Sequence, residues 1–409
     1  MQKKLLTVAV AGALAAPAIA VAQSTVEVYG TVNMAFGQFR YSESAAGQAS
    51  VSKWDVANGA SNYGIRSREN LGGGLAGWIQ IEQNAPLERS NNVAITPASR
   101  NSAIGLQGGF GNFFIGQWTT PWADLDALWG IGTVGFWGPV TSTIGRRETT
   151  GTAPNPNCQN FQSPAPSLGT SATNVPPSCD AVEAGGGVGH PFWRRVSQAV
   201  FYQSPVMAGV QAKVAFQTNE GKATSNTTTN GDPSLWSFSV QWSGAGGRAR
   251  VGAAYDRHKD FSVIGQTDTG YAIKGGFNFG VVDVGLAFEQ VKYNAPTGGE
   301  AKSKQYGVAL AVPVGPGSIR ASWSKQKEFD GSACGVLTCT QTGATEYNVG
   351  YEHRFSKRTN VGIGYAKITN QDNAIVTWTG APPNQGGASN NPFPGSDVST
   401  FFLSMTHRF

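Results

Sequence analysis

The charged residues whose spacing is most suggestive of chemistry gather in one long segment, residues 119–193. It holds five acids and two bases, a local net charge of −3: Asp124, Asp126, Glu148, Asp180, Glu183, Arg146 and Arg147. Carboxylates at this density can steer cations, and the alternative for any one of them is an ordinary solvated loop charge. The segment therefore offers an electrostatic site rather than a catalytic one.

No residue pattern points to catalysis, to a cofactor or to nucleic acid. The histidines are scattered and no nucleophile motif stands beside them: His190, His258, His353 and His407. No serine sits in a Gly-x-Ser-x-Gly turn, and "LGGGLAG" at 71–77 lacks the Lys-Ser/Thr of a phosphate-binding loop. No basic run or basic helix supports nucleic-acid binding. We expect a protein that is not an enzyme and carries no cofactor.

The four cysteines indicate disulfides. An even cysteine count in an exported chain favours pairing, and sequence order suggests Cys158–Cys179 and Cys334–Cys339. A zinc site is a weaker alternative, because only His190 lies near any of these cysteines. Free thiols remain the other alternative.

The N-terminus predicts export. Lys3 and Lys4 precede an apolar run that ends in Ala20-Val21-Ala22, which is typical of a signal peptide covering 1–22 and cut before Gln23. A membrane anchor or a buried helix is the alternative. Removal of two lysines from a net charge of +5 leaves 5 − 2 = +3 on residues 23–409. No later stretch approaches the roughly 18 consecutive apolar residues of a spanning helix.

Strict alternation of apolar and polar residues runs through the rest of the chain. "TEYNVGYEHRF" (345–355) sets Tyr347, Val349 and Tyr351 against Glu346 and Asn348. "KQYGVALAV" (304–312) repeats the pattern. A period of two residues indicates β-strands with one apolar and one polar or small face.

The connections between these strands alternate between short and long. Short ones stand at 108–112, 204–209, 244–248, 313–318 and 355–359, and long ones at 42–60, 84–99, 119–193, 220–234, 329–344 and 370–396. Successive antiparallel hairpins put every second turn on the same rim, so one rim is tight and the other elaborate. This pattern predicts an all-β transmembrane antiparallel barrel of about 16 strands. An eight-stranded sandwich with a second domain is the alternative.

The barrel prediction also orients the side chains. The apolar faces would look at lipid, while the Gly, Arg, Glu and Asn faces would line a water-filled lumen. Strand-end aromatics would form interfacial girdles: Tyr29, Trp78, Trp118, Trp236 and Trp323.

Five segments, taken in order, resemble the general Gram-negative outer-membrane porins of β-proteobacterial type. They are "VEVYGTVNMAF" (26–36), "SRENLGGGLAGWIQIE" (67–82), "SAIGLQGGFGNFFIGQWTTP" (102–121), "RVSQAVFYQSP" (195–205) and "YEHRFSKRTNVGIGYA" (351–366). The resemblance implies a homotrimer in the outer membrane that contacts its lipids and passes ions and small hydrophilic solutes. It also implies that 119–193 folds into the lumen as a constriction loop.

The same resemblance suggests pore residues. Arg100 and Arg195 match arginines of the family, and Arg194 stands beside the second of them. Asn62 and Gln117 replace two others, while Arg66 and Arg68 share a face with Asn62 and could substitute for it. With Asp124 and Asp126 opposite them, these residues would form a charge ladder across the constriction, and modest anion preference is expected.

In this family a terminal Phe is read by the barrel-insertion machinery, which implies that Phe409 is an assembly signal facing lipid. One rival to a general channel is a substrate-selective porin with an aromatic track. That track would comprise Trp118, Trp122, Trp129, Trp137 and Trp193. A barrel enzyme is the other rival, and it lacks a visible His-Ser pair.

Overall fold

The computed structural model describes most of the chain. Its described residues are 25–85, 87–88, 97–138, 192–218, 234–260, 265–294, 298–335, 339–374, 376–378 and 393–409. The predicted signal peptide (1–22) and the whole of 139–191, which contains the predicted Cys158–Cys179 pair, lie outside them. Among the described residues there is no helix whose length and hydropathy would let it cross a bilayer.

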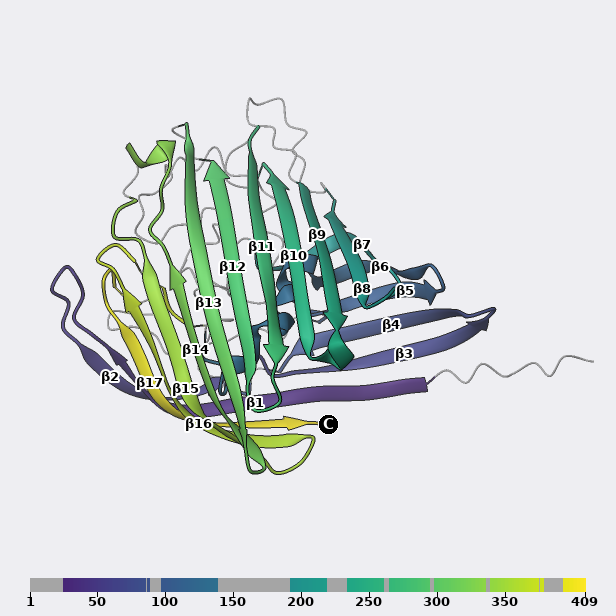
Figure 1. Cartoon of the computed structure of the whole chain (residues 1–409), viewed down its shortest axis with the longest axis horizontal. Helices are drawn as coiled ribbons and strands as arrows, with labels where there is room; N and C mark the ends of the chain where they lie inside the picture. The colour runs from purple at the N-terminus through teal and green to yellow at the C-terminus, as the bar shows by residue number, and fades with distance from the viewer. Residues whose placement is uncertain are drawn as a thin grey trace, which may run out of the picture.

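Within the described part of the chain, seventeen strands form one antiparallel sheet whose strongly tilted walls cross in projection (Figure 1). They are β1 (Thr25–Tyr41), β2 (Val51–Asn58), β3 (Asn62–Gly72), β4 (Leu75–Asn84), β5 (Ser102–Gly108), β6 (Gly111–Thr119), β7 (Arg195–Gln203), β8 (Val210–Gln217), β9 (Ser234–Gly244), β10 (Ala249–Lys259), β11 (Thr267–Asn278), β12 (Asp283–Asn294), β13 (Glu300–Val314), β14 (Gly317–Gln326), β15 (Ala344–Arg354), β16 (Thr359–Asn370) and β17 (Val398–Arg408).

The sheet closes into a barrel of sixteen spanning strands. β17 pairs with β1, from Thr31↔Arg408 to Tyr41↔Val398, so the last strand meets the first. β2 and β3 pair with successive parts of β1 and act as one strand interrupted at 59–61, where Ala60 has φ 58°. The count is therefore 17 − 1 = 16, which confirms the predicted all-β barrel. Closure leaves no unpaired edge in a medium that offers no hydrogen-bond partners.

The predicted connections agree closely with the gaps between the observed strands, with one correction. The long connection expected at 42–60 is partly strand, because β2 occupies Val51–Asn58 and extends the wall beyond β3. The connection between β6 and β7 spans 120–194. It opens with α2 (Pro121–Asp124), η1 (Leu125–Leu128) and η2 (Gly130–Gly132). Two further short turns are η5 (Ala245–Gly247) and η6 (Ser332–Gly335).

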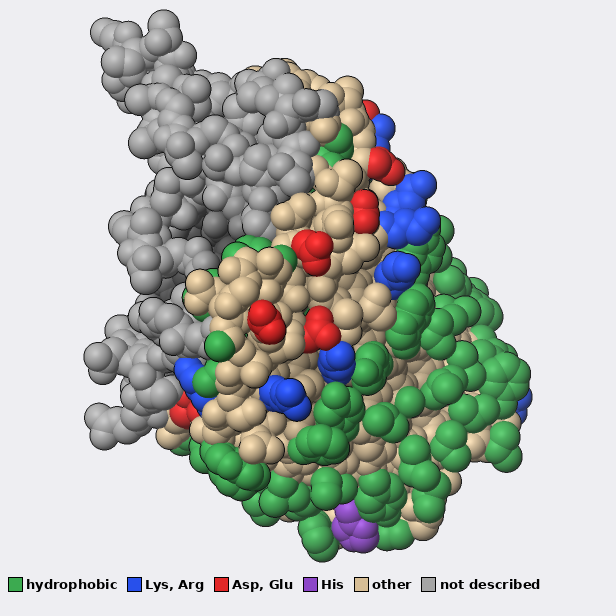
Figure 2. Space-filling view, turned by 90° about the vertical axis from the view of Figure 1, so that its left-hand side faces the viewer, with side chains coloured by type: hydrophobic (Ala, Val, Ile, Leu, Met, Phe, Trp, Pro, Cys, Tyr) green, Lys and Arg blue, Asp and Glu red, His purple; other side chains and the backbone are tan. Residues whose placement is uncertain are grey.

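The outward face of the wall is apolar. Val28 is 64% exposed, Ile363 63% and Phe401 67%, while the residues that alternate with them point inward. Figure 2 shows part of this apolar surface, bordered on one side by Lys, Arg, Asp and Glu side chains. An exposed apolar surface of this extent on a closed barrel is the lipid-facing band of an outer-membrane protein.

The predicted aromatic girdle needs a correction. Trp236 and Trp323 are exposed on the outward face, as expected. Tyr29, Trp78 and Trp118 instead point inward: the Tyr29 hydroxyl donates to Glu82 Oε2 at 3.0 Å, and Trp78 packs on Trp118. The prediction was wrong for these three because proximity to a strand end does not determine which face a residue occupies; alternation does.

Two of the long connections are anchored by specific contacts. Cys334 and Cys339 form a disulfide with a Cα–Cα separation of 5.3 Å, which confirms that predicted pair. Sulfurs joined in this way are not the thiolates that a zinc site would need. After β16, Trp378 is fully buried against Phe39, and its Nε1 donates to Glu346 Oε1 at 2.6 Å. Side chains of β1 and β15 therefore hold the described part of that connection.

The last residue completes the ring of main-chain pairing. Phe409 N donates to Gly30 O at 3.1 Å, and Gly30 N donates to Phe409 O at 3.1 Å. The ring shares the outward face of Phe401, Leu403 and Met405, is 49% exposed, and covers Gly30, where an added Cβ would lie 2.5 Å from Cζ. Gly30 therefore provides the space that the terminal ring occupies.

We expect deletion of Phe409 to reduce the amount of folded barrel severely. The deletion removes both hydrogen bonds to Gly30 at the seam, and unpaired backbone groups are costly next to hydrocarbon. The heat-modifiable mobility of the full-length protein in membranes measures folding. Val314→Ala, at another outward position near the same rim, should fold normally. A deletion variant with wild-type levels of folded protein would contradict the expectation.

Candidate functional site

The inner face of the barrel is divided into an open half and a covered half. Residues 120–138, which follow β6, contact inward-facing positions from β9 round to β17 and β1. The inner faces of β3–β5 carry exposed or half-buried polar side chains instead. Any passage bounded by the described residues therefore has these two surfaces as its walls.

Small residues on the strands make room for the covering segment. An added Cβ at Gly252 of β10 would meet Leu125 and Leu128, and one at Gly285 of β12 would meet the backbone of Trp129. Further along, Gly362 of β16 faces Val134. Glycine inside a strand often marks the close approach of another part of the chain, and here residues 125–134 approach these three positions.

Hydrogen bonds from the wall then fix the segment. Trp122 N donates to Ser237 Oγ at 3.2 Å, and Arg250 Nε donates to Leu128 O at 2.6 Å. Arg320 Nη1 donates to Thr133 O at 3.2 Å, and Val134 N donates to Asn348 Oδ1 at 3.1 Å. These bonds satisfy the polar backbone of a non-regular segment that is otherwise buried.

The acids of the segment point at lysines of the wall. Asp124 Oδ2 lies 3.0 Å from Lys213 Nζ of β8. Asp126 pairs with Lys274 of β11, whose Nζ is also 2.5 Å from Glu289 of β12. Burial raises the pKa of the Asp124 carboxyl, and the ammonium of Lys213 opposes that shift. Ion pairs with little solvent access lose much if one partner is removed, so they hold the segment firmly.

The predicted arginines occupy the open half of the inner face. Arg66 forms a bidentate pair with Glu27 at 2.8 and 3.0 Å and lies over the Tyr29 ring. Arg68 Nη1 donates to Gln107 Oε1. Arg100 Nε donates to Glu82 Oε1 at 2.7 Å. The side chains to which these arginines donate lie on β1, β4 and β5, whereas Asp124 and Asp126 pair with lysines.

The remaining predicted residues sit around the ends of β6 and β7. Arg195 Nε donates to Asn101 Oδ1 at 2.7 Å, and Gln117 Nε2 donates to Arg100 O at 3.3 Å. Arg194 is buried, and its carbonyl accepts from Thr120 N at 3.0 Å. Asn62 Nδ2 donates to Ala60 O at 3.1 Å, at the interruption between β2 and β3. Whether these residues line the narrowest point stays a prediction.

Sequence reasoning missed the residues that anchor the segment: Lys213, Arg250, Lys274, Glu289, Arg320 and Asn348. Each occupies an inward position, so a search for polar residues on the inner faces of β8–β15 would have found them. Their partners among residues 120–138 carry no comparable signal, because those contacts join elements far apart in sequence.

The tryptophans of the segment are packing residues in this structure. Trp122, Trp129 and Trp137 are fully buried, and Trp137 packs edge-on against Phe39 and Phe402. Trp118 and Trp193 are only partly buried. A continuous aromatic track for a solute would need accessible ring faces, and three of the five candidates offer none.

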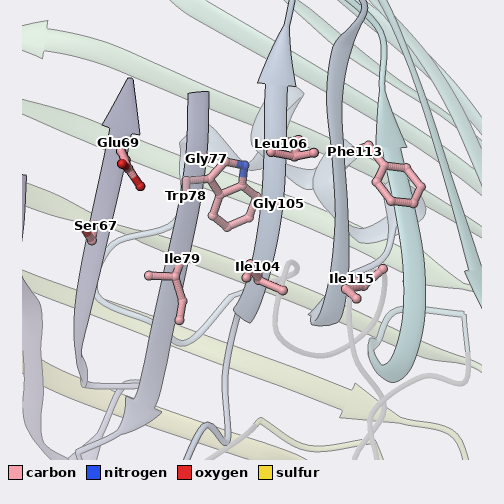
Figure 3. A pocket seen from close by; sticks show the side chains of 10 residues that line it. All are labelled: Ser67, Glu69, Gly77, Trp78, Ile79, Ile104, Gly105, Leu106, Phe113 and Ile115. Carbon is pink, nitrogen blue, oxygen red and sulfur yellow. The ribbon is translucent and has the colours of Figure 1, made fainter. Parts of the chain in front are cut away.

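A groove lies on the other side of the wall, outside the barrel. Figure 3 shows it across β3–β6, where Gly77 leaves a gap among outward-facing side chains such as Ile79, Ile104 and Ile115. Ser67 and Glu69 lie at one margin of it. The groove is apolar and faces away from the lumen, so it is separate from the channel.

Comparison with known proteins assigns the family. A family profile described as Gram-negative porin matches residues 7–373. Outer membrane porin protein 32 of Delftia acidovorans is 24% identical over 383 residues, covering 91% of each chain. Major outer membrane protein P.IB of Neisseria meningitidis serogroup B is 22% identical over 391 residues, covering 93% of this chain and 98% of the relative.

Solved structures share the fold. An anion-selective porin from Comamonas acidovorans superposes with a TM-score of 0.65 at 20% identity, covering 95% of this chain and all of that one. OmpT of Vibrio cholerae in a trimer form superposes with a TM-score of 0.58 at 14% identity, covering 94% of this chain and 99% of that one. The closed barrel, its polar inner face and the profile match agree: the chain belongs to the Gram-negative porin family and forms a passive outer-membrane channel for ions and small hydrophilic solutes.

Proposed function

We propose that residues 119–193 form the constriction of this channel and that its described part, 120–138, narrows one half of the bore. The observation that carries the proposal is the unbroken series of contacts from Ser237 of β9 to Phe39 of β1. About sixteen strands leave a wide aqueous lumen unless something occupies it. A segment held by ion pairs and hydrogen bonds reduces that width by a fixed amount.

We propose further that the channel has a modest anion preference. The segment's described acids pair with Lys213 and Lys274 of the wall, and Lys274 is shared with Glu289, so these carboxylates are turned away from the open half. On the open half, Arg68 donates to the neutral amide of Gln107. A guanidinium that faces water between low-dielectric walls attracts anions locally. The solved relative described as anion-selective is consistent with this sign.

No arrangement of the described residues favours the substrate-selective alternative, since Trp122, Trp129 and Trp137 are buried.

We also propose that the channel has no catalytic activity, that 1–22 is a cleaved signal, and that the barrel-insertion machinery reads Phe409. The outward ring of Phe409 at the seam supports the last point.

Arg68→Gln and Arg195→Gln should each shift the reversal potential in a potassium chloride gradient toward cations. One charge at about 5 Å from a passing ion in water changes local ion concentration two- to fourfold. The matched control is the neutral exchange Glu27→Gln with Arg66→Gln, which removes one charge of each sign and should leave selectivity unchanged. If neither arginine variant moves the potential, these residues do not line the path.

Gly285→Val should lower single-channel conductance in planar bilayers. The new side chain would meet the Trp129 backbone and displace the segment toward the bore, since that contact leaves no room for a Cβ. Ala253→Val adds the same bulk to an outward position of β10 and should conduct as the wild type does. A folded Gly285→Val channel with unchanged conductance would show that the segment does not limit flow.

We propose that the groove at Gly77 belongs to the contact between copies in a homotrimer. Among the described residues of β3–β6, the outward positions include Ile79, Ile104 and Leu106 and carry no Lys or Arg. Glu69, a charged side chain on this face, is costly against hydrocarbon but tolerable against a polar partner group. The trimer form of a solved structural neighbour supports the assembly.

Gly77→Phe, which fills the groove, should therefore convert trimers into monomers or dimers. Native mass spectrometry of the detergent-solubilised protein measures the state. Val308→Phe, which adds a ring to the outward face of β13, should leave the trimer intact. Intact trimers in both variants would show that the contact between copies lies elsewhere on the wall.

A further inference from the structure

Five lysines lie on the outer surface of β12, β13 and β14, one of them directly after the end of β14. They are at the rim that bears the long connections. They occupy outward positions and are called here the lysine patch: Lys292, Lys302, Lys304, Lys325 and Lys327. Lys292 lies directly opposite Lys302 in the sheet register. Lys327 N donates to Lys304 O at 2.8 Å, so these two are also cross-strand neighbours.

The two neighbouring pairs differ in their counter-charges. Glu300 lies 3.1 Å from Lys292 Nζ and 2.5 Å from Lys302 Nζ, and so bridges that pair. Asp330 also lies beside Lys302 through paired backbones. Within the described part of the chain, Lys304, Lys325 and Lys327 make no ion pair with an acid. Like charges directly opposite each other in a sheet are destabilising unless an anion lies between them.

The patch stands just above the apolar band. Along the outward face of β13, Lys304 is followed by Tyr306, Val308, Leu310 and Val312. Two residues of a strand tilted about 40° rise roughly 5 Å, so Lys304 lies about 5 Å above Tyr306. On β14, Lys325 is likewise next to Trp323 on the same face, and Lys327 Nζ lies 6.0 Å from the Tyr306 ring centre. Tyr and Trp mark the membrane interface, and the head-group layer above it is only about 5–7 Å deep.

The opposite rim of the same strands lacks this feature. There the outward positions and turns around β11–β14 carry Phe279, Val281, Val314 and Ile319, all exposed. On these strands the lysine patch is therefore confined to one membrane surface. In this family of barrels the long connections face the cell exterior, so that surface is the outer leaflet.

We propose that the lysine patch binds the phosphate groups of a phosphorylated glycolipid in the outer leaflet. Lys304, Lys325 and Lys327 supply three point charges at head-group height, and lysine ammonium groups bind phosphate well. The acyl chains would lie below on Tyr306, Val308 and Trp323. The binding site is on the outside of the wall and takes no part in conduction.

The test measures retention of a defined lipid by the solubilised full-length protein. Diphosphoryl lipid A is titrated into the purified channel and bound copies are counted by native mass spectrometry. The variant K304Q/K325Q/K327Q should bind about 100-fold more weakly, because three ammonium groups near an anionic surface are removed. The matched control R248Q/K357Q/R358Q removes three cations from the opposite rim and should bind as the wild type does.

Two further measurements keep the result interpretable. Heat-modifiable mobility and single-channel conductance should be unchanged in both triple variants, because the altered residues lie either in the patch on the outer surface or next to the short turns of the opposite rim. A dephosphorylated lipid A should bind the wild type as weakly as diphosphoryl lipid A binds the patch variant. Equal binding by wild type and patch variant, or equal binding of the dephosphorylated lipid, would overturn the proposal. Reversal by equimolar inorganic phosphate would overturn it as well, since it would assign the patch to free anions.

Discussion

Every other feature of this protein depends on the closure of the sheet by β1 and β17. A strand edge in hydrocarbon leaves backbone N–H and C=O groups without partners, at a cost of several kcal/mol each. Eleven registered residue pairs, from Thr31↔Arg408 to Tyr41↔Val398, remove that edge. The seam ends with Phe409 paired to Gly30. Closure also creates an inside and an outside, and the two-residue period then sorts the whole sequence between lipid and water.

The inner face of the wall accommodates and binds the segment 120–138. Inward glycines at Gly252, Gly285 and Gly362 remove bulk where the segment 120–138 must pass. Inward lysines and arginines at neighbouring positions then bind its carboxylates and carbonyls. Space and charge are thus supplied by the same strands, so the position of the segment is determined by the barrel more than by its own helical turns.

The charges of the channel divide between two tasks. On the covered half, Lys213 and Lys274 are used to fix the segment and are hidden with their acids. On the open half, Arg66 and Arg68 face water, although Arg66 shares its charge with Glu27. An ion pair turned toward the wall has little effect on a passing ion. A count of acids and bases in the sequence therefore does not distinguish the charges that fix the segment from those that act on ions.

The sequence alone determined the barrel. Alternation in segments such as 304–312 and 345–355, with every second connection short, predicted about sixteen strands and the connections between them, since both signals are local in the chain. It also indicated the Cys334–Cys339 pair, where five residues of separation leave few alternatives. The tertiary structure decided the features that do not depend on local sequence patterns. It showed that β2 extends into 42–60, that Tyr29, Trp78 and Trp118 point inward, and that Asp124 and Asp126 meet lysines of distant strands. Those outcomes depend on register and on contacts across the lumen, which exist only once the sheet has closed.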